Sequence, residues 1–523
     1  MFEDFNLKKQ DMRYLLGLLI FNAILVTYYI NFNVQLGISC SDVYLYLLNA
    51  LYFTGTNIHA TENIYLSPVV CFLTSLLFRC GLVDKLAIFI VTGLFAIFGN
   101  IGLYLLLKQF YDNTLSIAGS IIFSTLTLNL TWLANGTLDI PAVALTIWLV
   151  LFSIIAIKKN PKFYTLAGLF FVLSVFTRYT VVLTIPALLI IYIYENGLKI
   201  KKEDKKHVFK AITISMVVGI IIFATVFVMG HGQFGGGQML DRASGQTGSS
   251  TDPAFNPDYS YYLTNLPNFI SNSHTVFDGN PVLQNPTVLS WTVILILIIG
   301  ALLWLKDTKP KLEKKHAIPI ALFLISALIF TRITSLVTIF LVSVGLYLLG
   351  KDSDNETGIA MFVWIISNII FFTYLNIRVN RYIIPIFPAM IYFTIKAIDI
   401  INSKIRINRN IIPIVLIVLF AVQGFAFTET FEPTTQYQVT EEISNYIIDN
   451  NPDYQDIPIG TYNIRPYRWW IGDNVIGIPS GSHETIDESN LTYYISNAKQ
   501  PQLKNYSEIK QFDNLYLYQK TSY

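Results

Sequence analysis

Long stretches without a charged side chain are the feature that most limits what this chain can fold into. Nine uncharged apolar runs approach the ~20 residues that a helix needs to cross ~30 Å of hydrocarbon. They cover 14–30, 86–107, 114–134, 140–157, 211–229, 287–305, 333–350, 358–377 and 411–427, and four shorter runs cover 163–177, 179–194, 317–331 and 382–395. Charged residues make up only 13% of the 523 residues, against roughly 25% in soluble proteins. The sequence therefore predicts an all-α polytopic membrane protein with about thirteen transmembrane helices and excludes a soluble enzyme.

The positions of lysine and arginine predict the orientation of these helices. With a cytoplasmic N-terminus and thirteen crossings, the inner segments hold 22 of the 36 basic residues, and the outer loops between spans hold seven. This bias agrees with the positive-inside rule. The run at 65–78 is shorter and ends at Arg79. We interpret it as an interfacial helix, because counting it as a span would invert every later segment.

This topology divides the chain into two domains in a multi-pass protein of the cell membrane. Residues 1–427 form the transmembrane domain, with an outer loop at 32–85 that carries interfacial helices and a glycine-rich outer loop at 230–286. Residues 428–523 are predicted to form a small extracytoplasmic α/β domain, helical at 438–449 and extended at 457–461, 474–478, 491–496 and 514–518.

Charge and cysteine content exclude two further classes. The formal net charge is +2, which argues against a nucleic-acid partner because phosphate binding needs a concentrated basic surface. Three cysteines are too few for a disulfide framework.

Asp42 and Asp139 are acids at the outer ends of predicted helices. Asp42 lies in Ser-Cys-Ser-Asp-Val-Tyr, and Asp139 lies in Asn-Gly-Thr-Leu-Asp-Ile-Pro. Either can be a helix N-terminal acid that the helix dipole favours, with Ser41 capping the first helix. For Asp42, spacing alone favours that interpretation over a carboxylate that accepts a proton from an acceptor hydroxyl. The topology places both acids on the same side at the same depth, where they could bind a divalent cation or orient an acceptor; no other cofactor is expected.

Three arginines lie at the outer ends of spans, against the positive-inside trend. Arg378 and Arg381 stand three residues apart in Asn-Ile-Arg-Val-Asn-Arg-Tyr, and Arg178 follows another span in Phe-Thr-Arg-Tyr. A planar, permanently charged guanidinium suits a phosphate, whereas ordinary snorkelling of arginine at the membrane surface is an equal alternative.

Four polar residues near these groups are candidate substrate-binding residues. Tyr44 follows Asp42, Tyr382 follows Arg381, and His59 and Glu62 lie in the first outer loop. The histidine and glutamate have no metal-ligand spacing, and a solvated loop is their simpler interpretation.

The order of these motifs resembles that of the GT-C fold integral-membrane glycosyltransferases. The matching features are the outer acid after the first span, Leu66-Ser67-Pro68, Leu138-Asp139 with Pro141, and Arg381-Tyr382 followed by Pro385 and Pro388. The likeness covers roughly residues 10–427. Within that group the chain is most similar to the family 39 branch, which includes the protein O-mannosyltransferases and the lipid A aminoarabinose transferase.

The resemblance implies inverting transfer of a hexosyl or pentosyl group from a polyprenyl-phosphate-linked donor to a protein, lipid or cell-wall glycan acceptor on the outer face. By the matched positions, Asp42 is the base, Asp139 is a second acid, and Arg378 and Arg381 hold the donor phosphate. Many members carry Asp-Glu in the first loop where this chain has Asp42-Val43, and Arg178 replaces a common lysine.

Two other functions remain open. The oligosaccharyltransferase catalytic subunit, another GT-C enzyme, carries Trp-Trp-Asp-Tyr-Gly, and this chain has Trp469-Trp470-Ile471-Gly472-Asp473. The acid is displaced by two positions, so packing within the α/β domain is the simpler role of the tryptophan pair. A lipid or sugar transporter would place its charges at the membrane midplane, whereas the charges here gather at one face.

Overall fold

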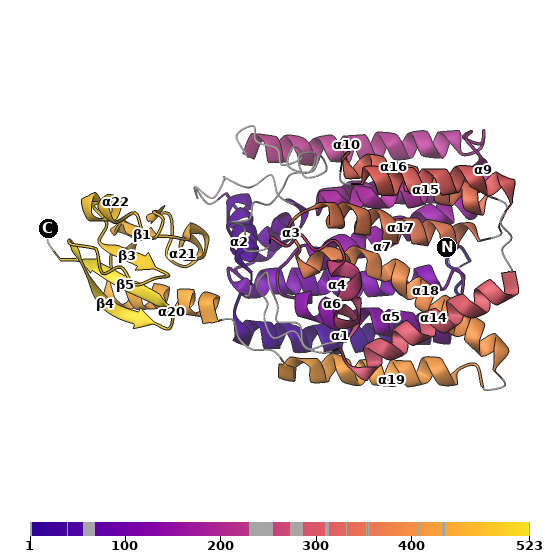
Figure 1. Cartoon of the computed structure of the whole chain (residues 1–523). Coiled ribbons are helices and arrows are strands. Elements are labelled where there is room, and N and C mark those ends of the chain that lie inside the picture. Colours follow the sequence, from indigo (N-terminus) through magenta and orange to yellow (C-terminus); the bar gives the residue numbers. More distant parts are fainter. Residues whose placement is uncertain are drawn as a thin grey trace.

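The computed structural model describes residues 3–38, 40–55, 68–229, 255–271, 286–308, 313–330, 332–351, 353, 355–405, 408–430 and 435–521. Two parts are visible in Figure 1: a bundle of helices and, beyond one end of it, a small domain that contains the sheet. The prediction of an all-α membrane domain followed by a small α/β tail is confirmed for the described residues.

Nine helical segments among the described residues are long and apolar enough to cross a membrane. Three of them begin with a 3₁₀ segment: η1 (Lys9–Asp11) before α1, η4 (Tyr179–Thr184) before α9, and η6 (Asn380–Ile386) before α18. The nine are α1 (Met12–Leu36), α4 (Lys85–Leu107), α7 (Asp139–Lys158), α9 (Ile185–Asn196), α10 (Lys205–Met229), α14 (Val288–Thr308), α17 (Glu356–Tyr374), α18 (Phe387–Lys404) and α19 (Ile411–Ala426).

The other four predicted spans correspond to shorter apolar helices. These are α5 (Asn113–Ser124), α8 (Tyr164–Val175) after η3 (Pro161–Phe163), α15 (Ala317–Ile329) after η5 (Lys314–His316), and α16 (Ser335–Gly350). The segment interpreted as an interfacial helix forms α3 (Pro68–Arg79). At 1.5 Å per residue, its 12 residues extend over about 18 Å.

The predicted span at 114–134 is not continuous, which corrects the sequence analysis. Helix α5 ends at Ser124, and a short helix α6 (Thr127–Trp132) follows. The side-chain amide of Asn129 donates to the carbonyl of Phe123 at 2.6 Å, and the hydroxyl of Thr125 donates to the carbonyl of Ile121. These side chains satisfy carbonyl groups that a continuous helix would pair with backbone amides.

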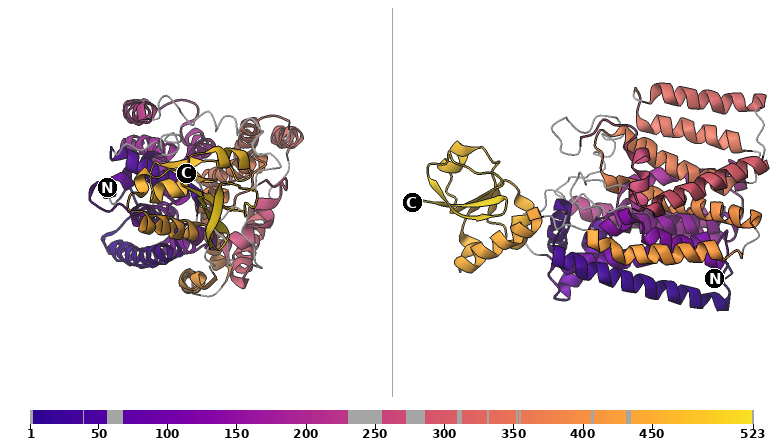
Figure 2. Two further views of the ribbon diagram at one scale, coloured as in Figure 1. Left: turned by 90° about the vertical axis from the view of Figure 1, so that its left-hand side faces the viewer. Right: turned by 60° about the horizontal axis from the view of Figure 1, so that its bottom comes forward.

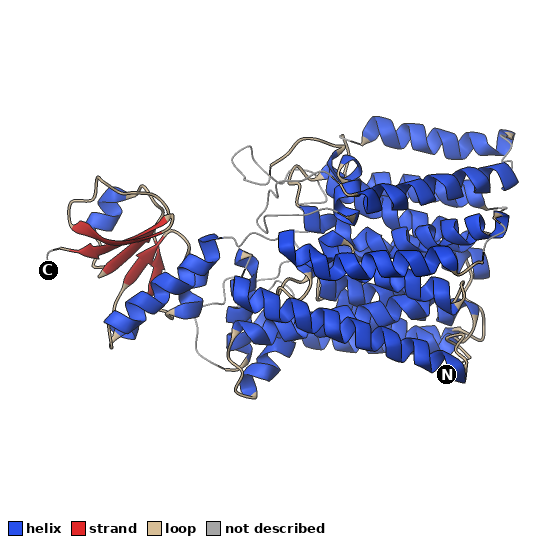
Figure 3. Cartoon of the chain, turned by 90° about the horizontal axis from the view of Figure 1, so that it is seen from below, coloured by secondary structure: helices blue, strands red, loops and turns tan. Residues whose placement is uncertain are grey.

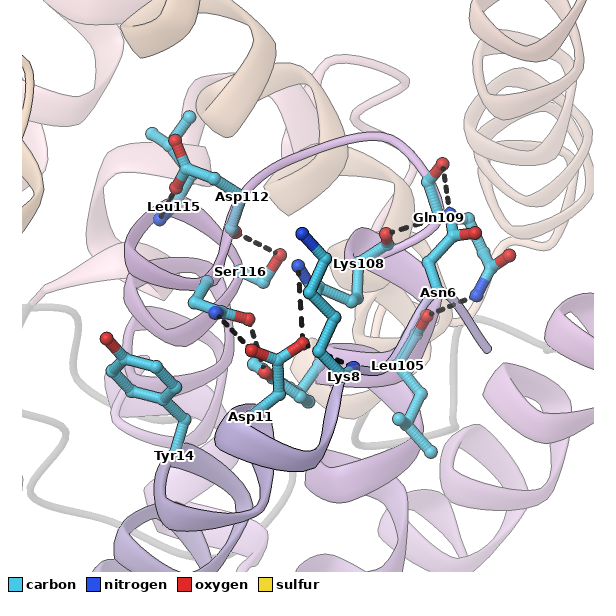
Figure 4. Close-up of polar contacts among 12 residues, drawn as sticks. Asn6, Lys8, Asp11, Tyr14, Leu105, Lys108, Gln109, Asp112, Leu115 and Ser116 are labelled. Atoms are coloured by element: carbon cyan, nitrogen blue, oxygen red, sulfur yellow. Dashed lines mark hydrogen bonds and ion pairs between the residues drawn. The ribbon is translucent and has the colours of Figure 1, made fainter. Parts of the chain in front are cut away.

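Segments predicted to lie on the inner side meet at the end of the bundle that holds the N-terminus. Asp11 of η1 (Lys9–Asp11) accepts a hydrogen bond from the backbone amide of Lys8 and lies 3.9 Å from the ammonium of Lys108, while Asn6 donates to the carbonyl of Lys108 (Figure 4). The ammonium of Lys159 donates to the side chain of Asn6 at 2.7 Å. We call this the N-terminal end of the bundle.

Helix α2 (Ser41–Phe53) lies across the opposite end, which we call the α2 end. In Figures 1 and 2 the sheet domain lies beyond this end, so the N-terminus and the C-terminal domain are on opposite sides of the bundle. This arrangement requires an odd number of crossings and agrees with the thirteen predicted.

Close packing of α4 on α7 fixes the helix that carries Asp139. A Cβ atom on Gly99 of α4 would lie 2.7 Å from the Cβ of Ala144 on α7, so a glycine is needed at this contact. Small residues bring helix backbones together in membranes, where lipid supplies little hydrophobic drive for association. The start of α7 is thereby held in place at the α2 end.

The C-terminal domain is a mixed five-stranded sheet with helices packed beside it (Figure 3). Strand order is β2-β1-β3-β5-β4, with β1 parallel to β2 and β3, and β5 antiparallel to β3 and β4. The elements are α20 (Thr435–Asn450), β1 (Ile459–Thr461), α21 (Ile464–Trp470), β2 (Val475–Gly477), α22 (His483–Glu488), β3 (Tyr493–Ser496), β4 (Tyr506–Phe512) and β5 (Leu515–Lys520).

Several short helices connect the larger elements. They are α12 (Tyr261–Thr264), α13 (Leu266–Ile270), η7 (Phe427–Thr430) and η8 (Tyr454–Asp456). The predicted strands at 457–461, 474–478, 491–496 and 514–518 overlap β1, β2, β3 and β5, whereas β4 was not predicted.

Candidate active site

Asp42 and Arg381 form the centre of a charged cluster at the α2 end. Asp42 lies in the first turn of α2, and Arg381 lies in η6 before α18. The Nη2 atom of Arg381 donates to Oδ2 of Asp42 at 2.8 Å, with the Asp42 side chain 35% exposed and the arginine side chain 16% exposed. The acid is therefore open on one side, while its partner is largely enclosed.

Asp139 is the second acid of the cluster and is almost fully buried. It is the first residue of α7, and its side chain is 1% exposed. Nη1 of Arg178 is in direct ionic contact with Oδ1, and Nη1 of Arg381 lies 3.8 Å from Oδ2. Arg381 thus lies within ion-pair distance of both carboxylates, which come from chain segments almost a hundred residues apart.

The turn before α7 brings Asp139 close to α2. Gly136 has a φ of +86°, and a Cβ there would lie 2.7 Å from Cγ1 of Val43. Glycine adopts this left-handed backbone without steric cost. The turn can therefore approach α2 at the residue next to Asp42.

Arg381 controls the protonation of Asp42. Burial by itself raises the pKa of Asp42, but the charge and hydrogen bond of Arg381, with the charges of Arg465 and Arg178, hold that pKa below its usual value. Asp42 is therefore ionised at neutral pH.

The predicted cap at the start of α2 differs from the observed one. Cys40, not Ser41, is the N-cap residue, and no side-chain hydrogen bond caps this helix. The carboxylate of Asp42 faces arginines instead of the first-turn amides. The structure therefore supports the charged cluster over the capping interpretation of this acid.

Arg378 lies apart from the acids and is engaged by backbone. It is 1% exposed, and its guanidinium donates to the carbonyls of Asp258, Phe372 and Thr373 at 3.2, 3.2 and 2.8 Å. These contacts tie the segment around residue 258 to the end of α17. The geometry gives Arg378 a positioning role, whereas Arg178 and Arg381 face the carboxylates.

Aromatic rings surround the two arginines. The guanidinium of Arg178 lies 5.2 Å from the ring centroid of Tyr382, and that of Arg381 lies 5.4 Å from the ring centroid of Trp132. Such cation–π contacts hold a guanidinium in one orientation. Tyr382 therefore lies beside the cluster as expected, and Trp132 is a neighbour that sequence reasoning missed.

Tyr44 faces the C-terminal domain. Its hydroxyl lies 3.3 Å from that of Thr440 on α20, and burial raises the pKa of Tyr44 to about 12. The other two candidate substrate-binding residues, His59 and Glu62, lie outside the described residues.

Arg465 joins the cluster from the C-terminal domain and was also missed. Its Nη1 lies 3.9 Å from Oδ1 of Asp42, and it is in the first turn of α21. Nothing in the local sequence distinguishes it from Arg468 on the same helix, so only the tertiary structure identifies it.

No group of three or more histidine, cysteine, aspartate or glutamate side chains that could hold a metal ion occurs in the described parts of the chain. The charge opposite the two carboxylates comes from arginines.

Comparison with known proteins gives one family match. Residues 66–228 match the family described as Dolichyl-phosphate-mannose-protein mannosyltransferase. The matched region includes α4, α7, Asp139 and Arg178. A comparison with curated protein sequences gives no significant match.

Solved structures with a similar fold cover nearly the whole chain. ArnT from Cupriavidus metallidurans bound to undecaprenyl phosphate has a TM-score of 0.60 and 10% identity, covering 95% of this chain and 97% of ArnT. The apo state of the same protein has a TM-score of 0.55 at the same identity and coverage. The Archaeoglobus fulgidus oligosaccharyltransferase complex with Zn and sulfate has a TM-score of 0.44 and 11% identity, covering 90% of this chain and 67% of that one.

The family match and the ArnT structures confirm the resemblance that the order of motifs predicts. The chain therefore has the GT-C fold of the integral-membrane glycosyltransferases, and its residues 66–228 match the dolichyl-phosphate-mannose-protein mannosyltransferase family.

Proposed function

We propose that the protein is a membrane glycosyltransferase that moves a sugar from a polyprenyl-phosphate-linked donor to an acceptor hydroxyl on the outer face, with inversion. The observation that carries this proposal is the position of Arg381, within ion-pair distance of both Asp42 and Asp139 at the α2 end. This largely enclosed arginine provides a cationic site for the phosphate, and the adjacent carboxylate is available to the acceptor.

The donor phosphate would bind Arg178 and Arg381. A guanidinium offers paired N–H groups that match phosphate oxygens, and it keeps its charge when buried. The similar ArnT structure contains undecaprenyl phosphate, and the matched family is named for a dolichyl-phosphate donor. These names support a polyprenyl phosphate as the lipid carrier of the donor.

An apolar groove near Arg178 suits the prenyl chain. It has a volume of about 540 Å³ and is lined mainly by α3, α4, α8 and α10, including Phe72, Phe98 and Leu173, with one residue each from α2 and α7. Leu173 belongs to α8, the helix that directly precedes Arg178. A lipid tail in this groove would place its phosphate towards the charged cluster.

The transfer step places Asp42 opposite the leaving phosphate. The acceptor oxygen forms a bond to the anomeric carbon while the bond from that carbon to the phosphate oxygen breaks. The acceptor proton passes to the carboxylate of Asp42, and the negative charge of the leaving prenyl phosphate is stabilised by Arg178 and Arg381. Attack from the face opposite the phosphate inverts the anomeric centre.

Donor binding would make Asp42 a stronger base. In the absence of ligand, Arg381 lowers the pKa of this acid, which makes the carboxylate a weak proton acceptor. A phosphate that accepts the hydrogen bonds of Arg381 weakens the pairing of this arginine with Asp42. The pKa of Asp42 then rises, because burial, which raises it, is less strongly opposed. Proton transfer is thereby linked to occupancy of the donor site.

The position of the cluster favours an enzyme over a transporter. Asp42 lies in a helix across the end of the bundle, and Asp139 is the first residue of its transmembrane helix. A permeation pathway would need its charged groups near the middle of the membrane.

The ion pairs of the two acids favour a site whose positive charge comes from arginines rather than from a divalent metal ion. Both carboxylates already lie close to guanidinium groups, which supply the positive charge that a divalent ion would bring. Cation binding would have to displace these ion pairs.

A transfer assay with a panel of polyprenyl-phosphate sugars on purified protein tests the proposal. It uses peptide, lipid and glycan acceptors, and hexose and pentose donors, to assign the sugar and acceptor classes. No transfer and no donor hydrolysis with any polyprenyl-phosphate sugar would contradict the proposal.

Asp42→Asn tests the base within the same assay. General-base catalysis contributes about 10²- to 10⁴-fold, so transfer should fall by that amount when it is measured at a temperature at which the variant remains folded. Asp84→Asn is the matched control, because Asp84 caps α4 by accepting from the amide of Leu86 at 2.7 Å, and Asn caps about as well as Asp. Equal turnover in the two variants would refute the base assignment.

A further inference from the structure

Arg465 is the one member of the charged cluster that comes from the C-terminal domain. It lies in the first turn of α21, more than 400 residues after Asp42 in the sequence, yet its Nη1 is 3.9 Å from Oδ1 of Asp42. Its side chain is 37% exposed, more than twice the exposure of Arg178 or Arg381. The C-terminal domain therefore contributes one arginine to the charged cluster, and this arginine lies beside the partly exposed Asp42.

The cluster carries more positive than negative charge. Three guanidiniums face two carboxylates: the arginines come from η6, α21 and the residue just before η4, and the acids come from α2 and α7. Arg178 and Arg381 are directly paired, whereas the contact of Arg465 is an ion pair beyond hydrogen-bonding distance. The guanidinium of Arg465 donates no hydrogen bond to another described residue, so among these residues its N–H groups are open to an anionic ligand.

Contacts between the domain and the bundle hold α21 beside α2. The ammonium of Lys85 at the start of α4 lies 2.8 Å from the carboxylate of Glu441 on α20 and 5.5 Å from the ring centroid of Trp470. The ring of Trp469 stacks on that of Phe78 of α3, with centroids 6.0 Å apart. These contacts involve α20 and the end of α21, so they hold the helix that carries Arg465 against the bundle.

The tryptophan pair packs at the boundary between the C-terminal domain and the bundle. It packs partly in the core of the C-terminal domain and partly against the apolar cluster of α2 and α3. Packing is the role that the sequence predicted, but the packing joins the two domains. Trp469 and Trp470 are the last two residues of α21, and Arg465 is its second residue, so the packing of the tryptophan pair determines where that arginine lies.

We propose that the C-terminal domain completes the donor site by supplying Arg465 as a third arginine for the phosphate, and that the Lys85–Glu441 contact holds the domain where this arginine reaches the cluster. The proposal rests on the proposed function, because it names a further residue for the same phosphate. The ligand class is a prenyl phosphate, whose dianionic head group can bind guanidiniums from both domains at once.

Binding of undecaprenyl phosphate to the purified full-length protein in lipid nanodiscs tests the role of Arg465. Arg465→Gln should weaken this binding by about 10- to 100-fold, the range expected for loss of a charge-assisted hydrogen bond. Arg468→Gln is the matched control, because Arg468 lies on the same helix and donates to the carbonyl of Val475 within its own domain. Undecaprenol, which lacks the phosphate, should bind all three proteins equally.

The outcomes separate this proposal from the proposed function. If the unsubstituted protein does not prefer undecaprenyl phosphate over undecaprenol, the proposed function fails. If it does so and Arg465→Gln binds the phosphate as tightly as Arg468→Gln, only the role of Arg465 is overturned. A role limited to holding Asp42 in place would leave phosphate affinity unchanged and lower only the turnover number.

Charge reversal tests the contribution of domain docking. Lys85→Glu places two acids against each other and should weaken undecaprenyl phosphate binding in the same direction as Arg465→Gln. Adding Glu441→Lys restores the opposite charges and should recover most of the affinity. A double variant as weak as the single one, or a single variant with full affinity, would overturn the docking part of the proposal.

Discussion

Arg381 is the residue on which both acids of the cluster depend. It donates to Asp42 at 2.8 Å and lies 3.8 Å from Asp139, in a position where only 16% of its side chain is exposed. A lysine has a single compact charge and cannot serve two carboxylates and a phosphate in one plane. Its guanidinium geometry therefore matters as much as its charge.

Arg381→Lys is expected to weaken undecaprenyl phosphate binding by roughly tenfold, because a bidentate contact is replaced by a point charge. Arg79→Lys is the matched control, since Arg79 ends α3 and donates to the carbonyl of Phe53. Binding assays on both folded variants decide the point. Equal affinities would limit the role of Arg381 to its ion pairs with the two carboxylates.

The pairing of Asp42 also predicts how stability depends on pH. The pKa of Asp42 is lower in the folded protein than in the unfolded chain, where it is ~3.9. The ionised carboxylate therefore stabilises the fold at pH values above the unfolded-state pKa. This stabilisation is lost as the pH falls through the lower pKa of the folded state. Melting temperatures of the wild type and Asp42→Asn should therefore differ at pH 7 and converge below about pH 4. A difference that grows in acid would contradict this sign.

At the scale of elements, the approach of the 133–138 turn to α2 sets the distance between the two acids. Ala134 and Gly136 both have positive φ, at +51° and +86°, and the glycine lies against Val43. This turn carries the chain directly into Asp139 at the start of α7. Its shape therefore positions one acid relative to the helix that carries the other.

Gly136→Ala should lower both stability and transfer. A left-handed non-glycine residue costs roughly 1 to 3 kcal/mol, and the added Cβ would lie 2.7 Å from Cγ1 of Val43, next to Asp42. Gly81→Ala is the control, because Gly81 has a φ of +96° and an added Cβ there would meet no atom within 4 Å, so this variant incurs backbone strain alone. Thermal unfolding and transfer assays should show stability loss in both variants and transfer loss only in Gly136→Ala.

Elements also differ in how well the sequence predicted them. Strands β1, β3 and β5 are largely buried and apolar, so their hydrophobic residues predicted strands. In β4, by contrast, the run Ser-Glu-Ile-Lys-Gln is exposed and mostly polar. An edge strand of this kind is held by its backbone hydrogen bonds to β5, and a polar edge protects the sheet from pairing with other chains.

At the scale of the whole molecule, the N-terminus and the C-terminal domain lie at opposite ends of the bundle. Basic residues of separate loops gather at the N-terminal end, where Arg409 pairs with Asp112 at 3.4 Å and Lys404 pairs with Asp307 at 2.8 Å. The arginines of the charged cluster lie at the other end. This distribution supports a cytoplasmic N-terminal end.

Labelling in intact cells tests this orientation. Cys80 is exposed after α3 at the α2 end, whereas Cys71 is buried. A membrane-impermeant maleimide should label Cys80 from outside, and Cys80→Ser should reduce that signal to what the half-buried Cys40 at the same end contributes. With Cys80→Ser in place, Ser403→Cys at the far end of α18 should react only after permeabilisation. The opposite pattern would invert the topology and place the cluster in the cytoplasm.

The sequence by itself determined that the chain is a polytopic membrane protein, where its apolar helices lie to within a few residues, and the position of each candidate acid and arginine along the chain. Hydropathy is a local property, since each apolar run must satisfy its own backbone and bury itself in lipid. The roles of the candidates remained open, because a helix-end acid and a catalytic acid look alike in one segment.

Only the tertiary structure decided which charges meet. It joined Asp42, Asp139, Arg178 and Arg381 from four separate segments, turned Arg378 towards backbone carbonyls, and added Arg465 from the C-terminal domain. The physical reason is that ion pairing depends on distances of a few ångströms between side chains. Those distances are set by helix packing and domain docking, which no local pattern of residues records.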